Sequence, residues 1–182
     1  CHSFERITPG KDYYLSMKNV ERVIGGKNKR SLKNVKNIFK NIFNLSADKI
    51  IEFTSPSESE TCKIIENSYR AINIAFIEEW RKFCSNNNLD LEKILSCIRQ
   101  RKTHNNIMRS GIGVGGYCLT KDPLFAKASS KQILHQKFDF PLGNTAMKVN
   151  QKMTHDVMSE INNKFKKKLF GKKVLLIGVS YR

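Results

Sequence analysis

The stretch ESETCKIIENSYRAINIAFIEEWRKFCSN, residues 58–86, decides the fold of this chain. Its apolar residues recur every three or four positions, which is the period of an α-helix. The main apolar stripe consists of Ile65, Tyr69, Ile72, Phe76 and Phe83. The stripe is widened by Ile64, Ala71 and Ala75, and the other side of the helix is apolar as well, with Ala71, Ile74, Ala75 and Ile77. Because little of the circumference stays polar, we expect a long, largely buried helix at the centre of a mainly α-helical chain.

One line along this helix is polar. Glu60, Lys63, Asn67 and Arg70 are three or four residues apart and therefore share a face. Spacing alone favours an ordinary solvated face, with a Glu60–Lys63 ion pair worth roughly 0.2–0.5 kcal/mol. The apolar remainder of the helix favours burial instead, and a buried Lys63 or Asn67 would need a hydrogen-bonding partner or a ligand.

The rest of the chain predicts further helices and short strands. Helical spacing is found at residues 31–43, 89–99, 123–129 and 144–168. Ser31 is placed to cap the first of these helices. We expect strands at residues 49–54 and 173–177 and a loop at 101–116. This order predicts a helical domain with parts of an α/β domain at each end.

The chain is strongly basic, with a net charge of +17 from 33 Lys and Arg against 16 Asp and Glu. Such a charge raises the possibility of binding to nucleic acid or to a membrane surface. The basic residues are dispersed over several predicted helices, however, and no basic stripe with interleaved aromatic residues is present. We therefore favour solvated helix faces and a small anionic substrate. No apolar run approaches the roughly 20 residues that a membrane span requires.

The cysteines and histidines follow no metal-binding or disulfide pattern. The five cysteines are scattered, at positions 1, 62, 84, 97 and 118, without a C-x-x-C pair. An odd, scattered set is typical of free thiols in a reducing compartment, so we expect a cytoplasmic protein. The four histidines lack the spacing of metal ligands, and we expect no metal site.

The run GIGVGGYCLTKDP, residues 111–123, is rich in glycine and contains a cysteine. It satisfies G-x-G-x-x-G, but the polar residues 105–110 precede it where a dinucleotide-binding fold needs an apolar strand. We therefore interpret it as a tight loop rather than a dinucleotide site. Cys118 ends this loop, close to Lys121 and Asp122. A thiol beside a cation and exposed amides is a candidate nucleophile, whereas an inert buried cysteine is the alternative.

Four segments of the chain resemble, in the same order, motifs of the UDP-glucose/GDP-mannose dehydrogenase family. GIGVGGYCLTKDP resembles the nucleophile loop of that family, and ETCKIIENSYRAINIAFIEE resembles its central helix. FERITPG, with the following VIGG, is similar to an earlier motif, and KKVLLIGVSYR is similar to the strand that opens the C-terminal domain. The chain departs from these motifs at Phe4, Glu78, Tyr117 and Arg182.

The resemblance implies a domain organisation. Residues 1–54 would be the tail of an N-terminal NAD-binding α/β Rossmann domain, and residues 55–150 a central helical dimerisation domain with the cysteine loop. Residues 151–182 would be a connecting helix and the first strand of a truncated C-terminal UDP-binding α/β domain. The chain is then expected to be a fragment that is inactive by itself, with its cofactor-binding residues unassigned.

The resemblance also implies a reaction, the NAD-dependent oxidation of the C6 hydroxymethyl group of a UDP-sugar to a carboxylate. Cys118 would hold the sugar as a thiohemiacetal and then as a thioester. Lys63 and Asn67 match the residues that stabilise the oxyanion, Asp122 matches the group that positions water or acts as a base, and Glu5 matches an acid of thioester hydrolysis. The substrate-binding positions implied are Gly115, Gly116, Lys121 and, more loosely, Arg101. The motifs favour UDP-N-acetylhexosamine over UDP-glucose.

Two other functions stay open at this point. The chain could be a helical dimerisation module without catalysis, because the apolar stripe on the central helix predicts a homodimer. A basic nucleic-acid-binding protein is the least favoured alternative. As partners we expect a UDP-sugar and a second copy of the chain, with no nucleic acid and no membrane.

Overall fold

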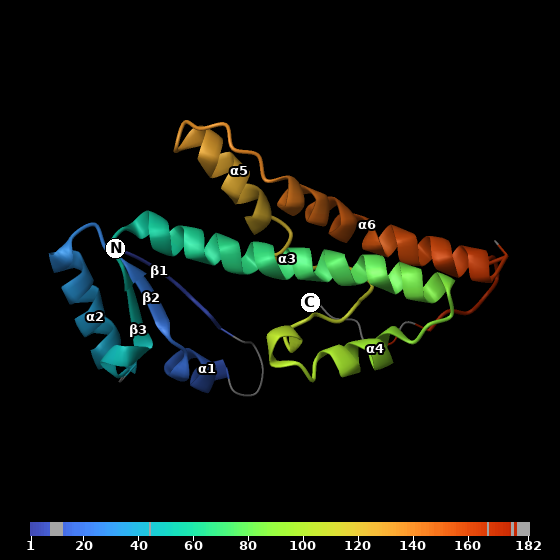
Figure 1. Cartoon of the computed structure of the whole chain (residues 1–182), viewed down its shortest axis with the longest axis horizontal. Helices are drawn as coiled ribbons and strands as arrows, with labels where there is room; N and C mark the ends of the chain where they lie inside the picture. The colour runs from blue at the N-terminus through green and yellow to red at the C-terminus, as the bar shows by residue number, and fades with distance from the viewer. Residues whose placement is uncertain (8–12, 44, 167, 176, 178–182) are drawn as a thin grey trace. The chain divides into compact units, whose positions relative to one another are not determined.

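The computed structural model describes residues 1–7, 13–43, 45–166, 168–175 and 177 (Figure 1). The chain packs as two compact units, Cys1–Ile65 and Glu66–Arg182. The long helix α3, Pro56–Asn86, begins in the first unit and continues through the second. This helix confirms the one predicted at residues 58–86. None of the helices in the described ranges combines the length and the apolar composition that a bilayer span requires.

The first unit contains a sheet of three strands, β1 (His2–Phe4), β2 (Arg22–Gly25) and β3 (Ile50–Phe53), in that spatial order. β1 is antiparallel to β2, and β2 is parallel to β3. The central strand β2 is buried along its whole length, as expected of a strand with a neighbour on each side. β3 confirms the strand predicted at residues 49–54.

Helix α2, Lys29–Phe43, connects the two parallel strands β2 and β3. The prediction that Ser31 caps this helix is wrong, because Ser31 lies within its first turn. The side chain of Asn28 accepts a hydrogen bond from the Ser31 amide at 2.9 Å, and the Ser31 hydroxyl accepts one from the Asn28 amide at 3.2 Å. This reciprocal pair is the arrangement of a capping box, so the helix begins two residues earlier than expected.

Several short elements of the first unit had no sequence signal. They are the strands β1 and β2 and the helix α1, Tyr13–Asn19. A strand of three or four residues offers too few positions for an alternating pattern to be recognised, and β2 begins with a charged residue, Arg22. The unit is therefore more ordered than the sequence predicted.

The second unit is helical. Its further helices are α4 (Leu91–Ile98), α5 (Asp122–Gln132) and α6 (Pro141–Lys164), which confirm the helices predicted there. The predicted loop at residues 101–116 contains one short 3₁₀ helix, η2 (Lys102–His104). The strand expected at residues 173–177 is wrong for the part that is described, 173–175 and 177. A strand needs a hydrogen-bonded neighbour, and no described residue pairs with this segment.

The buried residues of α3 are mostly small or polar, and they do not include the large residues of the main predicted stripe. Asn67, Ala71, Ala75 and Glu78 share one face of the helix and are each at most 5% exposed. Helix α6 runs alongside this face in the same direction (Figure 1), and Asn150 donates a hydrogen bond to the Ala71 carbonyl at 3.0 Å. The stripe is the exposed side: Ile65, Tyr69, Phe76 and Phe83 are each about half exposed or more.

Near the C-terminal end of α3, charged side chains connect this helix to α6. Arg81 forms two hydrogen bonds with the fully buried carboxylate of Glu78, at 2.8 and 2.9 Å, and two with Glu160 of α6, at 2.7 and 3.0 Å. The carboxylates of Glu78 and Glu160 raise the pKa of Arg81. Lys82 pairs with Asp156 of α6 in the same region. The charged residues of α3 thus compensate the buried Glu78 and hold the two helices together.

We predict that Glu78→Ala lowers the free energy of unfolding by about 2 kcal/mol, because it removes a buried carboxylate and leaves a cavity. The cost is reduced because Arg81 keeps Glu160 as a partner. The measurement is urea-induced unfolding followed by circular dichroism. Glu79→Ala, at the exposed neighbouring position, should change the free energy by at most about 0.5 kcal/mol. Equal effects of the two substitutions would contradict a structural role for Glu78.

Candidate active site

Cys118 lies in an exposed turn that leads into α5. Its backbone carbonyl accepts hydrogen bonds from the amides of Lys121, at 3.3 Å, and Asp122, at 2.9 Å. Gly116 has a φ of +80°, a left-handed conformation that glycine adopts without steric cost. The Thr120 hydroxyl donates to the Gly116 carbonyl at 2.7 Å. The glycine and these local hydrogen bonds therefore present the cysteine on a tight turn, with its thiol accessible.

The carboxylate of Asp122, the first residue of α5, is held on both sides. Asn67 of α3 donates to its Oδ2 at 2.6 Å, and the Lys121 ammonium lies 3.0 Å from its Oδ1. Asn67 is 2% exposed and Asp122 is 7% exposed, so their hydrogen bond is shielded from water. A carboxylate in the first turn of a helix is also stabilised by the helix dipole. This contact connects the turn that carries Cys118 to the long helix.

The polar line on α3 is solvated in part: Glu60 and Arg70 are exposed and Lys63 is half-buried, whereas Asn67 is buried. Asn67 is buried and has a partner, so it is not part of a solvated face. Its side-chain amide has two N–H groups, of which one is donated to Asp122.

The first unit brings two further candidate residues together. Lys63 lies one helical turn before Asn67 on α3, and its ammonium donates to the backbone carbonyl of Glu5 at 3.2 Å. The same ammonium lies 5.3 Å from the centre of the Phe4 ring, a cation–π contact. The Glu5 side chain is half exposed, and its carboxylate pairs with Arg22. Sequence reasoning missed Arg22, which no motif or spacing had indicated.

The loop before the glycine run is fastened to α3. Asn73 accepts a hydrogen bond from the Met108 amide at 3.0 Å, and Asn106 donates to the Tyr69 hydroxyl at 2.7 Å. Arg101, a predicted substrate contact, is exposed and directly precedes η2. Gly115, another predicted contact, is exposed next to Gly116. Their roles in substrate binding stay predictions.

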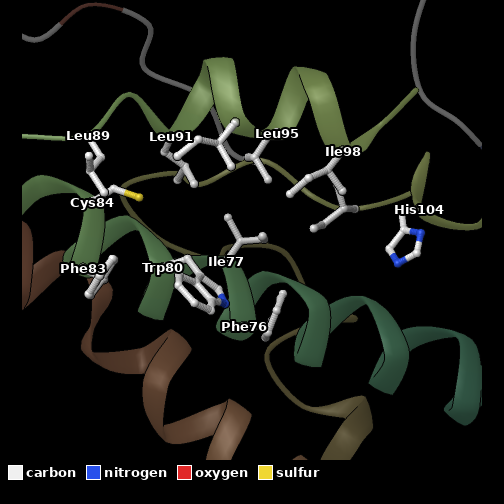
Figure 2. A pocket seen from close by; sticks show the side chains of 12 residues that line it. Phe76, Ile77, Trp80, Phe83, Cys84, Leu89, Leu91, Leu95, Ile98 and His104 are labelled. Carbon is white, nitrogen blue, oxygen red and sulfur yellow. The ribbon is translucent and has the colours of Figure 1, made fainter. Parts of the chain in front are cut away.

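An apolar cavity of about 370 Å³ lies between α3, α4 and the loop that follows α4 (Figure 2). The side chains of Phe76, Trp80 and Leu95 point into it in Figure 2. On α3, the Trp80 ring contacts Phe76 and Phe83 edge to face, with centroid distances of 6.3 and 5.6 Å. The cavity is open on one side, where the large aromatic residues of α3 are about half exposed.

The turn between β2 and α2 is the place in the described first unit where a strand, a glycine pair and a helix follow one another. A Cβ atom on Gly25 would lie 2.3 Å from the Ser55 carbonyl, and one on Gly26 would lie 2.4 Å from Cγ of Leu32. Ser55 and Leu32 therefore pack directly against these glycines, and the amides of Asn28 and Ser31, which a phosphate would need, are already bonded to each other's side chains. The glycines permit close packing, and the described residues do not fit an NAD site at this turn.

The fold and the site define a helical domain that presents a thiol beside a buried amide–carboxylate pair. Residues 57–152 match the model of the UDP-glucose/GDP-mannose dehydrogenase family, central domain. Because this match covers more than half of the chain, the chain belongs to the UDP-glucose/GDP-mannose dehydrogenase family.

Individual relatives agree with this assignment. The UDP-N-acetyl-D-mannosamine dehydrogenase of Methanococcus vannielii is 31% identical over 100% of this chain, which covers 40% of that protein. The enzyme of the same name from Salmonella typhi is 32% identical over 86% of this chain and 34% of its own length. The native structure of the UDP-N-acetyl-mannosamine dehydrogenase Cap5O from Staphylococcus aureus matches with a TM-score of 0.75 at 28% identity, over 99% of this chain and 39% of that chain. The chain thus spans about 40% of such relatives.

We predict that Asn67→Asp destabilises the protein by about 2–3 kcal/mol near pH 7, because it places two carboxylates side by side in a buried position. The deficit should shrink as the pH falls toward about 4, since one carboxyl group then binds a proton and restores the hydrogen bond. Unfolding by urea at several pH values measures this. Ser68→Asp, at the partly exposed next position, is the control and should show a small deficit without this pH dependence. A pH-independent deficit in Asn67→Asp would contradict the assigned contact.

Proposed function

We propose that this chain is the central part of an NAD-dependent nucleotide-sugar 6-dehydrogenase in which Cys118 is the nucleophile. The observation that supports this most directly is the exposed thiol of Cys118 on a turn fastened to α3 through Asp122 and Asn67. These three residues stand at matching positions of the family motifs. Membership of the family supports the dehydrogenase class, and the residues would supply a nucleophile and polar groups for it.

The proposed substrate is a UDP-N-acetylhexosamine, which would be oxidised at C6 to the corresponding uronate. The three relatives described above are named as dehydrogenases of UDP-N-acetylmannosamine, which favours this class over UDP-glucose. Gly115, Gly116 and Lys121 would contact the substrate. Arg101 would do so as well, although it matches the family motif more loosely. The cytoplasmic location stays a prediction.

The proposed chemistry removes four electrons from the sugar. Two hydrides leave C6 in successive oxidations, and NAD is the proposed acceptor of both. Between them the Cys118 thiolate adds to the C6 aldehyde, so that a C–S bond forms and the carbonyl oxygen becomes an alkoxide. Loss of the second hydride leaves a thioester. Water then adds to the thioester carbon, the C–S bond breaks, and the carboxylate and the thiolate are released.

The polar residues have proposed roles in these steps. Lys63 and Asn67, one turn apart on α3, would stabilise the oxyanion with an ammonium and an amide N–H group. Asp122 would orient the attacking water or accept its proton, and Glu5 would act in thioester hydrolysis. The contact of Asn67 with Asp122 supports a coupled role for the two, because movement of either side chain displaces the other.

The alternative function, a dimerisation module without catalysis, is favoured by one observation. The apolar cavity of the second unit opens onto the half-exposed rings of Phe76, Trp80 and Phe83, and monomers rarely expose large apolar patches without a partner. We propose that a second copy of the chain covers this surface in a homodimer, which is compatible with either function.

For the dehydrogenase we predict that Cys118→Ser abolishes uronate formation, with a loss of about 1,000-fold or more, because a serine hydroxyl is a far poorer nucleophile near neutral pH. The assay uses the protein expressed from its full reading frame, with NAD and UDP-N-acetyl-D-mannosamine, and quantifies the uronate by chromatography. Cys97→Ser, which changes another exposed thiol, is the control and should retain activity. Wild-type turnover in Cys118→Ser would make Cys118 a structural thiol.

For the homodimer we predict that Trp80→Glu weakens self-association by about 100-fold or more, because it places a charge in the centre of the apolar surface. Sedimentation equilibrium measures the dissociation constant. Tyr117→Glu substitutes an aromatic residue that is 75% exposed and does not line the cavity, so it should leave the association unchanged. If Trp80→Glu associates like the wild type, the surface is not the interface.

A further inference from the structure

Arg22 is a charged residue on the central strand β2, and 2% of it is exposed. A buried guanidinium loses its hydration and needs compensation by an anion and by hydrogen-bond acceptors. The proposed reaction assigns no role to this residue. Its contacts therefore indicate what the protein gains from burying a positive charge at this position.

The guanidinium is fixed by several groups of the first unit. Its Nη1 pairs with the carboxylate of Glu5, and its Nη2 donates to the Met17 carbonyl at 2.6 Å. The Phe43 ring of α2 lies 4.4 Å from the guanidinium carbon and the Phe39 ring 5.8 Å from it. The buried Nε has no hydrogen-bond partner among the described residues. These contacts leave Arg22 little freedom to move, and Glu5 is the carboxylate that compensates its charge.

The end of strand β1 brings Glu5 close to Arg22. In the antiparallel pair of β1 and β2, Phe4 is the partner of Val23. Glu5 directly follows Phe4, the last residue of β1, and Arg22 directly precedes Val23 as the first residue of β2. The pairing of β1 with β2 therefore brings the two side chains within reach of each other.

Glu5 is held at a second point as well. Its backbone carbonyl accepts a hydrogen bond from the Lys63 ammonium at 3.2 Å, while its side chain reaches Arg22. The side chain nevertheless remains 51% exposed. The ion pair with the buried Arg22 thus limits the orientations of a carboxylate that stays accessible to water, and a fixed orientation is what a group that directs a water molecule needs.

We infer that Arg22 is a positioning residue that orients the Glu5 carboxylate for hydrolysis of the thioester. The inference rests on the proposed function, in which Glu5 acts in that step. Arg22 touches no reacting atom in this role and acts through Glu5. Lysine cannot replace it fully, because an ammonium lacks the planar fork that reaches Glu5 and the Met17 carbonyl together.

The test measures the fraction of Cys118 that carries the acyl group during turnover. The protein expressed from its full reading frame is mixed with NAD and UDP-N-acetyl-D-mannosamine, quenched with acid and analysed by mass spectrometry. Glu5→Gln and Arg22→Lys should each raise this fraction about 5-fold or more and lower kcat about 10-fold, with KM changed less than about 2-fold. The double variant should resemble Glu5→Gln alone, because Arg22 acts through Glu5.

Lys36→Met is the matched control, since it removes an ion pair with Glu52 in the same unit and should leave the acylated fraction unchanged. If Arg22→Lys does not fold, Phe43→Leu keeps both charges but removes the ring next to the guanidinium, and it should raise the fraction by a smaller factor. A wild-type fraction in Arg22→Lys or, failing that, in Phe43→Leu, together with accumulation in Glu5→Gln, would overturn the inference. Absence of an adduct in every variant, including Glu5→Gln, would overturn the proposed function itself.

Discussion

Asn67 donates a hydrogen bond to Asp122 across 55 positions of sequence, and both residues are largely shielded from water. This contact joins the middle of α3 to the first residue of α5, and the turn that carries Cys118 lies directly before α5. The small residues Ala71 and Ala75 on the same face of α3 allow other helices to approach closely. The exposed thiol thus depends on a buried polar pair, whose loss would release the turn from its support.

The helices could be predicted because each is long enough for its period to appear. The 31 residues of α3 contain many repeats of the helical period. Apolar residues occupy most of the helix surface, and this correctly predicted that Asn67 is buried. The cap at Ser31 was misassigned because Asn28, three residues earlier, is an equally good capping residue. Strands β1 and β2 were missed because they are too short to show alternation.

The sequence motifs indicated which residues belong to the candidate site, but they did not indicate which of these residues contact one another. Nothing in the local sequence indicates that Asn67 meets Asp122, since that contact depends on how the helices of the second unit pack. Arg22 had no signal either, because its contact with Glu5 depends on the pairing of β1 with β2, which the sequence does not reveal. The apolar stripe was recognised, yet the side of α3 buried within the chain is the one with small residues, which pack closely.

Selective alkylation of the cysteines tests most directly the claim that Cys118 is the nucleophile. The protein expressed from its full reading frame is treated with iodoacetamide, with and without UDP-N-acetyl-D-mannosamine, and the labelling of each cysteine is followed by mass spectrometry. Cys97, which is also exposed, serves as an internal reference. The account predicts that the nucleotide sugar protects Cys118 but not Cys97, and that activity falls in proportion to the labelling of Cys118. Full activity after complete alkylation of Cys118 would contradict it.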